Sequence, residues 1–134
     1  MKPIFRFSLI ILLSLSLWAC SGGQKNTAES SPGNANAGAE LFAKPVLGSQ
    51  AGCKTCHSLQ PGVVIVGPSL AGIASLAAER EADKSAEEYL RESITAPNQY
   101  LVEGYPENVM PLVYEKELTA EEIDSLVAYM LTLK

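Results

Sequence analysis

The stretch SQAGCKTCHSL, residues 49–59, decides how the rest of the chain is interpreted. It places two thiols three positions apart, at Cys53 and Cys56, and the one histidine of the 134-residue chain, His57, follows directly. Three kinds of site use such a group: a redox dithiol, part of a zinc site, or a covalent haem attachment. The remaining sequence has to distinguish among these three.

The residues outside this stretch favour the haem interpretation. A thioredoxin-like dithiol needs a βαβ setting, and no part of the chain alternates convincingly as strands do. A structural zinc site needs four ligands, and Cys20 is the one further thiol in a chain without a second histidine. The order C-x-x-C-H instead predicts one covalent haem c, bonded through Cys53 and Cys56, with His57 as an iron ligand. The dithiol and zinc interpretations stay open as alternatives.

The charge of the chain limits the kinds of partner, and its length limits the number of domains. The chain carries 15 acidic against 10 basic residues, a net charge of −5. An acidic surface repels phosphate backbones, so we expect no nucleic-acid partner. The length suits one small domain.

Residues 1–19 are predicted to be an export signal. Lys2 and Arg6 precede an apolar run over residues 7–19, which is the usual order of a signal peptide. The run is shorter than the ~20 residues that span a bilayer, and an uncleaved membrane anchor remains the alternative. Export agrees with the haem prediction, because haem is attached covalently outside the cytoplasm.

Leu17, Ala19 and Cys20 resemble the lipobox of bacterial lipoproteins. The resemblance implies that Cys20 becomes the first mature residue and carries acyl chains, which anchor a protein stably to a lipid membrane. Residues 20–35 are small and polar, so we expect a lipidated flexible tether with a reach of about 20 Å. The predicted location is the outer face of the bacterial cytoplasmic membrane or another periplasmic membrane surface.

Helical periodicity dominates the predicted domain, residues 36–134. Thr119 with Glu122 and Ser85 with Glu88 form capping-box patterns, each followed by apolar residues at helical spacing. Shorter helices are expected over residues 36–43 and from residue 69 onward, with one short extended piece over residues 62–66. We predict an all-α domain with long loops and a core too thin to fill the molecule without a further group.

The second axial ligand of the iron is predicted by elimination. A second histidine is excluded because His57 is alone, and Met1 is lost with the signal. Met130 lies on the apolar face of the last predicted helix, where packing explains it. Met110 lies in the proline-containing loop GYPENVMPLVY and is our predicted ligand; a loop methionine that fills a gap in the core is the alternative.

Ligation by His57 and Met110 predicts electron transfer rather than catalysis. A thioether opposite an imidazole favours Fe(II) and raises the reduction potential. Both axial positions are then occupied, so no iron site is open to a substrate, and we expect no enzyme activity. An enzyme or gas sensor with an open iron remains the alternative if Met110 is not a ligand.

Over residues 36–134 the chain resembles the class I, mono-haem cytochromes c. Gly38 and Phe42 match the glycine and aromatic residue of the family's N-terminal helix, and Leu126 and Tyr129 match the pair in its C-terminal helix. The resemblance implies the all-α cytochrome c fold, with these two helices crossing where the glycine lets their backbones approach.

Two further stretches carry the resemblance. VGPSLAG, residues 66–72, matches the loop in which the carbonyl of Pro68 would accept a hydrogen bond from His57 and fix its tautomer. Residues 89–111, which lead to Met110, are similar to a subgroup that includes the cytochrome c domains of haem–copper oxidase subunit II and other respiratory-complex cytochromes.

Two points remain open after the resemblance. The chain inserts AKPVLGSQAG, residues 43–52, so the path from the first helix to the haem is undetermined. Arg80, Tyr100 and Tyr105 are candidate partners of the haem propionates, and each could equally be an ordinary surface or packing residue.

The expected function is that of a membrane-tethered carrier of single electrons between respiratory complexes. Its partners would be a redox donor and a redox acceptor protein, and the lipid membrane through acylated Cys20. The alternative is a fixed haem subunit of a larger quinol-oxidising or terminal reductase complex.

Overall fold

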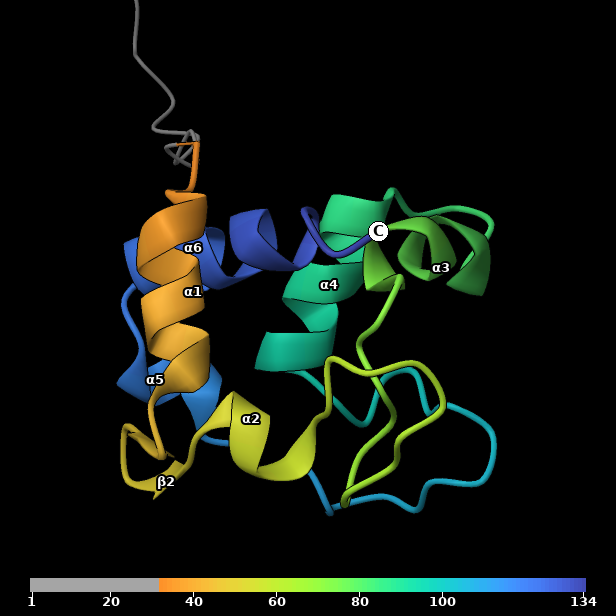
Figure 1. The fold of residues 1–134 in the computed structure, drawn as a ribbon, viewed down its shortest axis with the longest axis horizontal. Coiled ribbons are helices and arrows are strands. Elements are labelled where there is room, and N and C mark those ends of the chain that lie inside the picture. Colours follow the sequence, from red (N-terminus) through yellow and green to blue (C-terminus); the bar gives the residue numbers. More distant parts are fainter. Residues whose placement is uncertain (1–31) are drawn as a thin grey trace, which may run out of the picture.

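The computed structural model describes residues 32–134. The predicted signal over residues 1–19, the lipidation site Cys20 and most of the predicted tether lie outside the described residues. The described chain forms α1 (Ala35–Ala43), β1 (Val46–Leu47), β2 (Gln50–Ala51), α2 (Cys53–Cys56), α3 (Ile73–Arg80), α4 (Ala86–Thr95), α5 (Tyr114–Glu117) and α6 (Ala120–Met130) (Figure 1). The predicted all-α class is confirmed, with one two-stranded sheet added.

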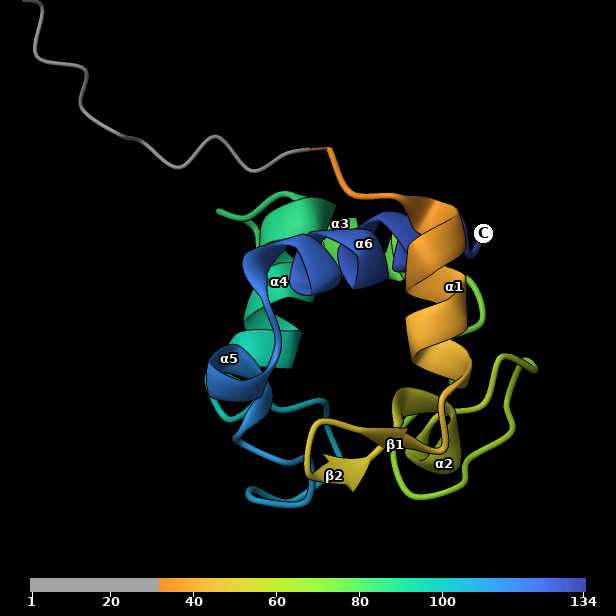
Figure 2. The same cartoon turned by 90° about the vertical axis from the view of Figure 1, so that its left-hand side faces the viewer.

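Helices α1 and α6 cross at close range, as the resemblance implied (Figures 1 and 2). A Cβ atom added to Gly38 would lie 1.9 Å from the backbone oxygen of Ser125, so no larger residue fits at this contact. One turn further along, the rings of Phe42 and Tyr129 pack with their centroids 5.4 Å apart. The crossing therefore joins the two ends of the domain.

Both predicted capping boxes are present. The hydroxyl of Ser85 accepts from the backbone N–H of Glu88 at 3.2 Å, and Thr119 and Glu122 repeat the arrangement at the start of α6. These caps satisfy N–H groups that the helices leave free. Helix α1 begins at Ala35, the last residue assigned to the tether, because the side chain of Asn34 caps it.

The structure differs from the expected elements in three places. Helix α3 begins at Ile73 rather than near residue 69, because Gly72 before it has a left-handed φ of 71°. Residues 62–66 form a loop and not an extended strand. The single-turn helices α2 and α5 were not predicted, since four residues are too few to show a period.

The insertion over residues 43–52 forms a hairpin that packs against α5. Val46 and Ala51 pair across the antiparallel strands, and Leu47 is buried. The hydroxyl of Tyr114 on α5 donates to the carbonyl of Ala51 at 2.5 Å. The hairpin therefore carries the chain from α1 to the start of α2, which answers how the first helix reaches Cys53.

The core lies where α1, α3, α4 and α6 meet. Its buried apolar members are Leu41, Phe42, Leu47, Ile73, Ala77, Tyr89, Leu90, Ile94, Tyr114, Leu118, Ile123, Leu126, Val127 and Met130. Several of them also face the cavity described below. Of the helices within residues 32–134, none combines the length and apolar character needed to cross a bilayer.

Candidate functional site

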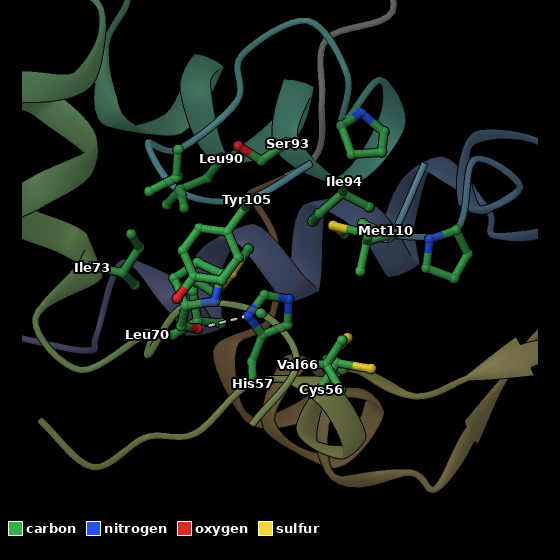
Figure 3. Close-up of a pocket in the computed structure, with 18 of the residues that line it drawn as sticks. Cys56, His57, Val66, Leu70, Ile73, Leu90, Ser93, Ile94, Tyr105 and Met110 are labelled. Atoms are coloured by element: carbon green, nitrogen blue, oxygen red, sulfur yellow. Dashed lines mark hydrogen bonds between the residues drawn. The ribbon is translucent and has the colours of Figure 1, made fainter. Parts of the chain in front are cut away.

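An open-sided cavity lies between the core helices and two long loops, residues 57–72 and residues 96–113 (Figure 3). It has about 1290 Å³ of space free of atoms, part of it continuous with solvent. Five residues that the sequence singled out line it: Cys53, Cys56, His57, Pro68 and Met110. The fold thus brings the thiol pair, the histidine and the loop methionine to one place.

The first wall of the cavity, the His57 wall, consists of residues 52–70. The single turn of α2 places Cys53 and Cys56 beside the cavity, and the backbone N–H of His57 closes the turn on the carbonyl of Cys53 at 2.9 Å. Burial raises the pKa of the Cys53 thiol to about 11, so this thiol is protonated at neutral pH.

Backbone hydrogen bonds hold the rest of the His57 wall against α2. The N–H groups of Val66 and Gly67 both donate to the carbonyl of Cys56, at 3.1 and 2.9 Å. The N–H of Leu70 donates to the carbonyl of Ser58 at 2.8 Å. These bonds fold the loop back so that its middle lies beside the imidazole.

The imidazole of His57 is oriented by one hydrogen bond. Its Nδ1 atom lies 2.8 Å from the carbonyl oxygen of Pro68, marked by the dashed line in Figure 3. A carbonyl can accept but not donate, so Nδ1 carries the proton and Nε2 keeps its lone pair. Burial lowers the pKa of His57, and this effect outweighs the Pro68 bond, which raises it. The imidazole ring is therefore neutral at pH 7. The ring is therefore prepared to bind a metal ion through Nε2.

Gly67 is part of the site although the sequence did not single it out. A Cβ atom at this position would lie 2.5 Å from Cε1 and 3.0 Å from Nε2 of His57. A side chain there would push the imidazole away. The signal available in the sequence was a glycine directly before the proline that accepts the histidine's hydrogen bond.

The second wall, the Met110 loop, consists of residues 96–113 between α4 and α5. Met110 is half-buried, packs against the core and lines the cavity (Figure 3). Met130 is 7% exposed in the core, where the sequence placed it, and it also lines the cavity. Two methionines within residues 32–134 therefore border the same space.

The three candidate propionate partners also line the cavity. Arg80 comes from the end of α3, and Tyr100 and Tyr105 come from the Met110 loop. The ring of Tyr100 packs edge-to-face on Tyr89, with centroids 5.4 Å apart. Their role toward a propionate stays a prediction.

Polar side chains at the cavity include one that the sequence analysis missed. Asn98, at the start of the Met110 loop, lines the cavity and bonds to Asn108. Within residues 32–134 no group of three or more His, Cys, Asp or Glu side chains lies close enough to hold a metal ion. Cys53, Cys56 and His57 thus gain no further ligand of these types from the described part of the chain.

Comparison with known families identifies the same chemistry. The family model described as "Cytochrome c" matches residues 35–134. A search of curated proteins found no match. Proteins of that family bind covalently attached haem c, usually one in chains of this class.

The residues of the cavity fit such a group. Two thiols lie one helical turn apart on α2, the spacing used for bonding to two vinyl groups. A neutral imidazole with a free Nε2 lies directly beside them, and Gly67 leaves room for the ring. The walls that face this group are mainly apolar, which suits a porphyrin.

Proposed function

The chain belongs to the cytochrome c family, and from that premise we propose that it is a membrane-tethered, mono-haem electron carrier whose iron is ligated by His57 and Met110. The family's function is haem-based electron transfer, and its members are generally carriers rather than enzymes. The haem supplies the one-electron couple. The protein supplies the attachment, the axial ligands and the apolar surroundings that set the potential.

The orientation of His57 carries this proposal. Its bond to Pro68 frees Nε2 for the iron and fixes the plane of the ring. Met110 borders the same cavity from the second wall, the Met110 loop. If His57 and Met110 both hold the iron, no coordination position would be open to a substrate, which is why we propose a carrier and not an enzyme.

The ligand assignment is tested by replacing each methionine at the cavity. We expect Met110→Ala to lose the weak far-red absorption band of methionine-ligated ferric haem and to bind carbon monoxide rapidly when reduced. Met130→Leu is the matched control, because Leu conserves the volume of Met in a core and the far-red band should persist. A band that survives in Met110→Ala and disappears in Met130→Leu would assign the ligand to Met130 instead.

The tether proposal rests on the lipobox-like residues and on where the described chain begins. The described chain enters the domain at the start of α1, which lies at the far end of the molecule from α2 (Figure 1). A membrane anchor at Cys20 would therefore attach at the end of the domain away from α2 and leave the α2 end accessible to partners. We expect Cys20→Ala to release the protein from membranes while its covalent haem stays, measured by haem staining of membrane and soluble fractions.

The surface beside the cavity supports docking to a redox partner. Val63, Val64 and Ile65, which do not line the cavity, are between 41% and 60% exposed, and residues 55–78 contain no Asp, Glu, Lys or Arg. Exposed apolar patches mark interaction sites, and lasting complexes use more apolar interfaces than brief encounters do. This patch favours a second candidate, a fixed haem subunit of a quinol-oxidising or terminal reductase complex.

Purification separates these two candidates. A fixed subunit is extracted from the membrane in mild detergent together with the same partner proteins at a constant molar ratio. In that case the double variant Val64→Ser, Ile65→Ser should be recovered with a smaller amount of these partners. A mobile carrier elutes alone, and the same double substitution should slow its electron transfer without changing its spectrum.

A further inference from the structure

The Met110 loop is closed by a pair of asparagine side chains. The side-chain N–H of Asn98 donates to the side-chain oxygen of Asn108 at 2.9 Å. The backbone N–H of Asn108 donates in return to the side-chain oxygen of Asn98 at 3.0 Å. These two bonds join residues ten positions apart, and Met110 lies two residues beyond the second asparagine.

Each asparagine is placed by its surroundings. Asn98 lies three residues beyond the end of α4, after the C-cap Ala96 and the buried Pro97. The next residue, Gln99, donates its N–H to the carbonyl of Ala96 at 2.9 Å. Asn98 is therefore fixed to the end of a capped helix. Asn108 has a φ of 62°, the one positive φ of a non-glycine residue within residues 32–134. Asparagine tolerates this left-handed conformation better than other side chains do.

The remaining hydrogen bonds of the loop are short-range. Within the described chain they join residues no more than four apart, such as the N–H of Tyr105 with the carbonyl of Val102 at 3.0 Å. A loop of this length gains entropy when its ends separate, and two bonds across its base reduce that freedom. The asparagine pair thus connects the segment that carries Met110 to α4.

We propose that Asn98 and Asn108 are positioning residues for Met110, and that their paired hydrogen bonds keep its sulfur at the axial position of the haem. This inference rests on the ligand role proposed for Met110. When the pair is broken, the loop opens more often, the methionine leaves the iron more often, and an external ligand binds faster. The chemistry at the iron is unchanged; what changes is the fraction of time in which the methionine is away.

The test compares three variants of the haem-loaded protein. Asn98→Ala removes both bonds. Asn108→Gly removes one and keeps the left-handed backbone, so it remains informative if Asn98→Ala fails to take up haem. Gln99→Ala is the matched control, because Gln99 is an exposed side chain in the same loop.

Carbon monoxide binding to the reduced protein measures how often the methionine is displaced. We expect binding about tenfold faster in Asn98→Ala and about threefold faster in Asn108→Gly, as two and one neutral hydrogen bonds would give. Gln99→Ala should equal the wild type. Hydrogen exchange of the amides over residues 104–111 should rise in the same order, which reports on the loop without reference to the iron.

Thermal measurements separate positioning from general stability. We expect the far-red band to disappear at lower temperature in Asn98→Ala, while the far-ultraviolet circular dichroism of the helices melts close to the wild-type temperature. Unchanged carbon monoxide rates in both asparagine variants, with the band intact, would overturn the positioning role alone. A wild-type protein without the band would overturn the ligand role of Met110, and this inference with it.

Discussion

The two walls of the cavity are held in different ways, although each presents one proposed axial ligand. In the His57 wall, backbone bonds from Val66 and Gly67 fold the loop onto Cys56 of α2, and the bond from Leu70 reaches Ser58 just beyond it. The hydroxyl of Ser69 also donates to the carbonyl of Gln60 at 2.7 Å. Of the hydrogen bonds that the Met110 loop makes within the described chain, only the two between Asn98 and Asn108 join residues more than four positions apart. The histidine is therefore held by a dense local network, and the methionine by a long loop with few ties.

This difference has a consequence for an electron carrier. A firmly oriented histidine keeps the ligand field on one side of the iron constant. If Met110 is the ligand, as proposed, its loosely tied loop would let it leave the iron without unfolding of the helices, because local opening costs less than global unfolding. We therefore expect perturbations of the His57 wall to affect haem incorporation and perturbations of the Met110 loop to affect ligand exchange.

The largest effect is expected at the thiols of the His57 wall. Cys53→Ala combined with Cys56→Ala should abolish covalent attachment, because no thiol is left at the cavity to form a thioether with haem. Haem staining after denaturing electrophoresis and the mass of the intact chain measure this directly. Cys20→Ala is the control and should keep its covalently bound haem. A double variant that still carries haem after denaturation would refute the attachment site.

The next largest effect is expected at Gly67. The Gly67→Ala methyl group would overlap the His57 ring and should cost about 1–3 kcal/mol in folding free energy, with a changed haem spectrum. Gly62→Ala is the control in the same loop, where an added Cβ meets no atom within 4 Å and the cost is the strain of its φ of 71°, about 1 kcal/mol. Urea unfolding monitored at the haem compares them. Identical spectra in the two variants would show that the ring does not depend on Gly67.

A smaller effect is expected where the two walls are joined. Tyr114, just after the Met110 loop, bonds to Ala51, just before Cys53. Tyr114→Phe should lower the free energy of unfolding by about 1 kcal/mol, the usual net contribution of one hydrogen bond. Tyr129→Phe, on α6 away from this contact, is the control for loss of a hydroxyl. Equal stability of Tyr114→Phe and the wild type would show that this hydrogen bond makes no net contribution to holding the hairpin on α5.

The smallest effect is expected at the exposed contact between Glu117 and Ser49. The Ser49 hydroxyl and backbone N–H donate to the Glu117 carboxylate, at 2.7 and 2.6 Å, and hold its pKa below the ordinary 4.5. The contact therefore stabilises the fold above pH 4.5 and is lost as pH falls through the lower pKa of the folded state. Melting temperatures of the wild type and Glu117→Gln should differ slightly at pH 7 and converge toward pH 3. Glu115→Gln, the same carboxylate-to-amide change on the same helix but outside this contact, is the matched control.

The elements that were predicted correctly have local signals. Thr119 with Glu122 and Ser85 with Glu88 cap their helices through residues three apart, so a short window contains the whole interaction. The close contact of Gly38 with the last helix was predicted from the resemblance to a family and not from periodicity. Periodicity identifies each helix but does not show which distant helices pack together. The hairpin was missed because strands of two residues are too short to alternate.

The chemistry of this protein follows from contiguous residues, and its geometry does not. The thiol pair and histidine occupy one turn, so Cys53, Cys56 and His57 predict their cofactor without any knowledge of the fold. The room that Gly67 leaves for the imidazole and the bond from Asn98 to Asn108 depend on the path of the chain through space. Such contacts form between segments that pack together after folding, and no local pattern of residue types encodes them.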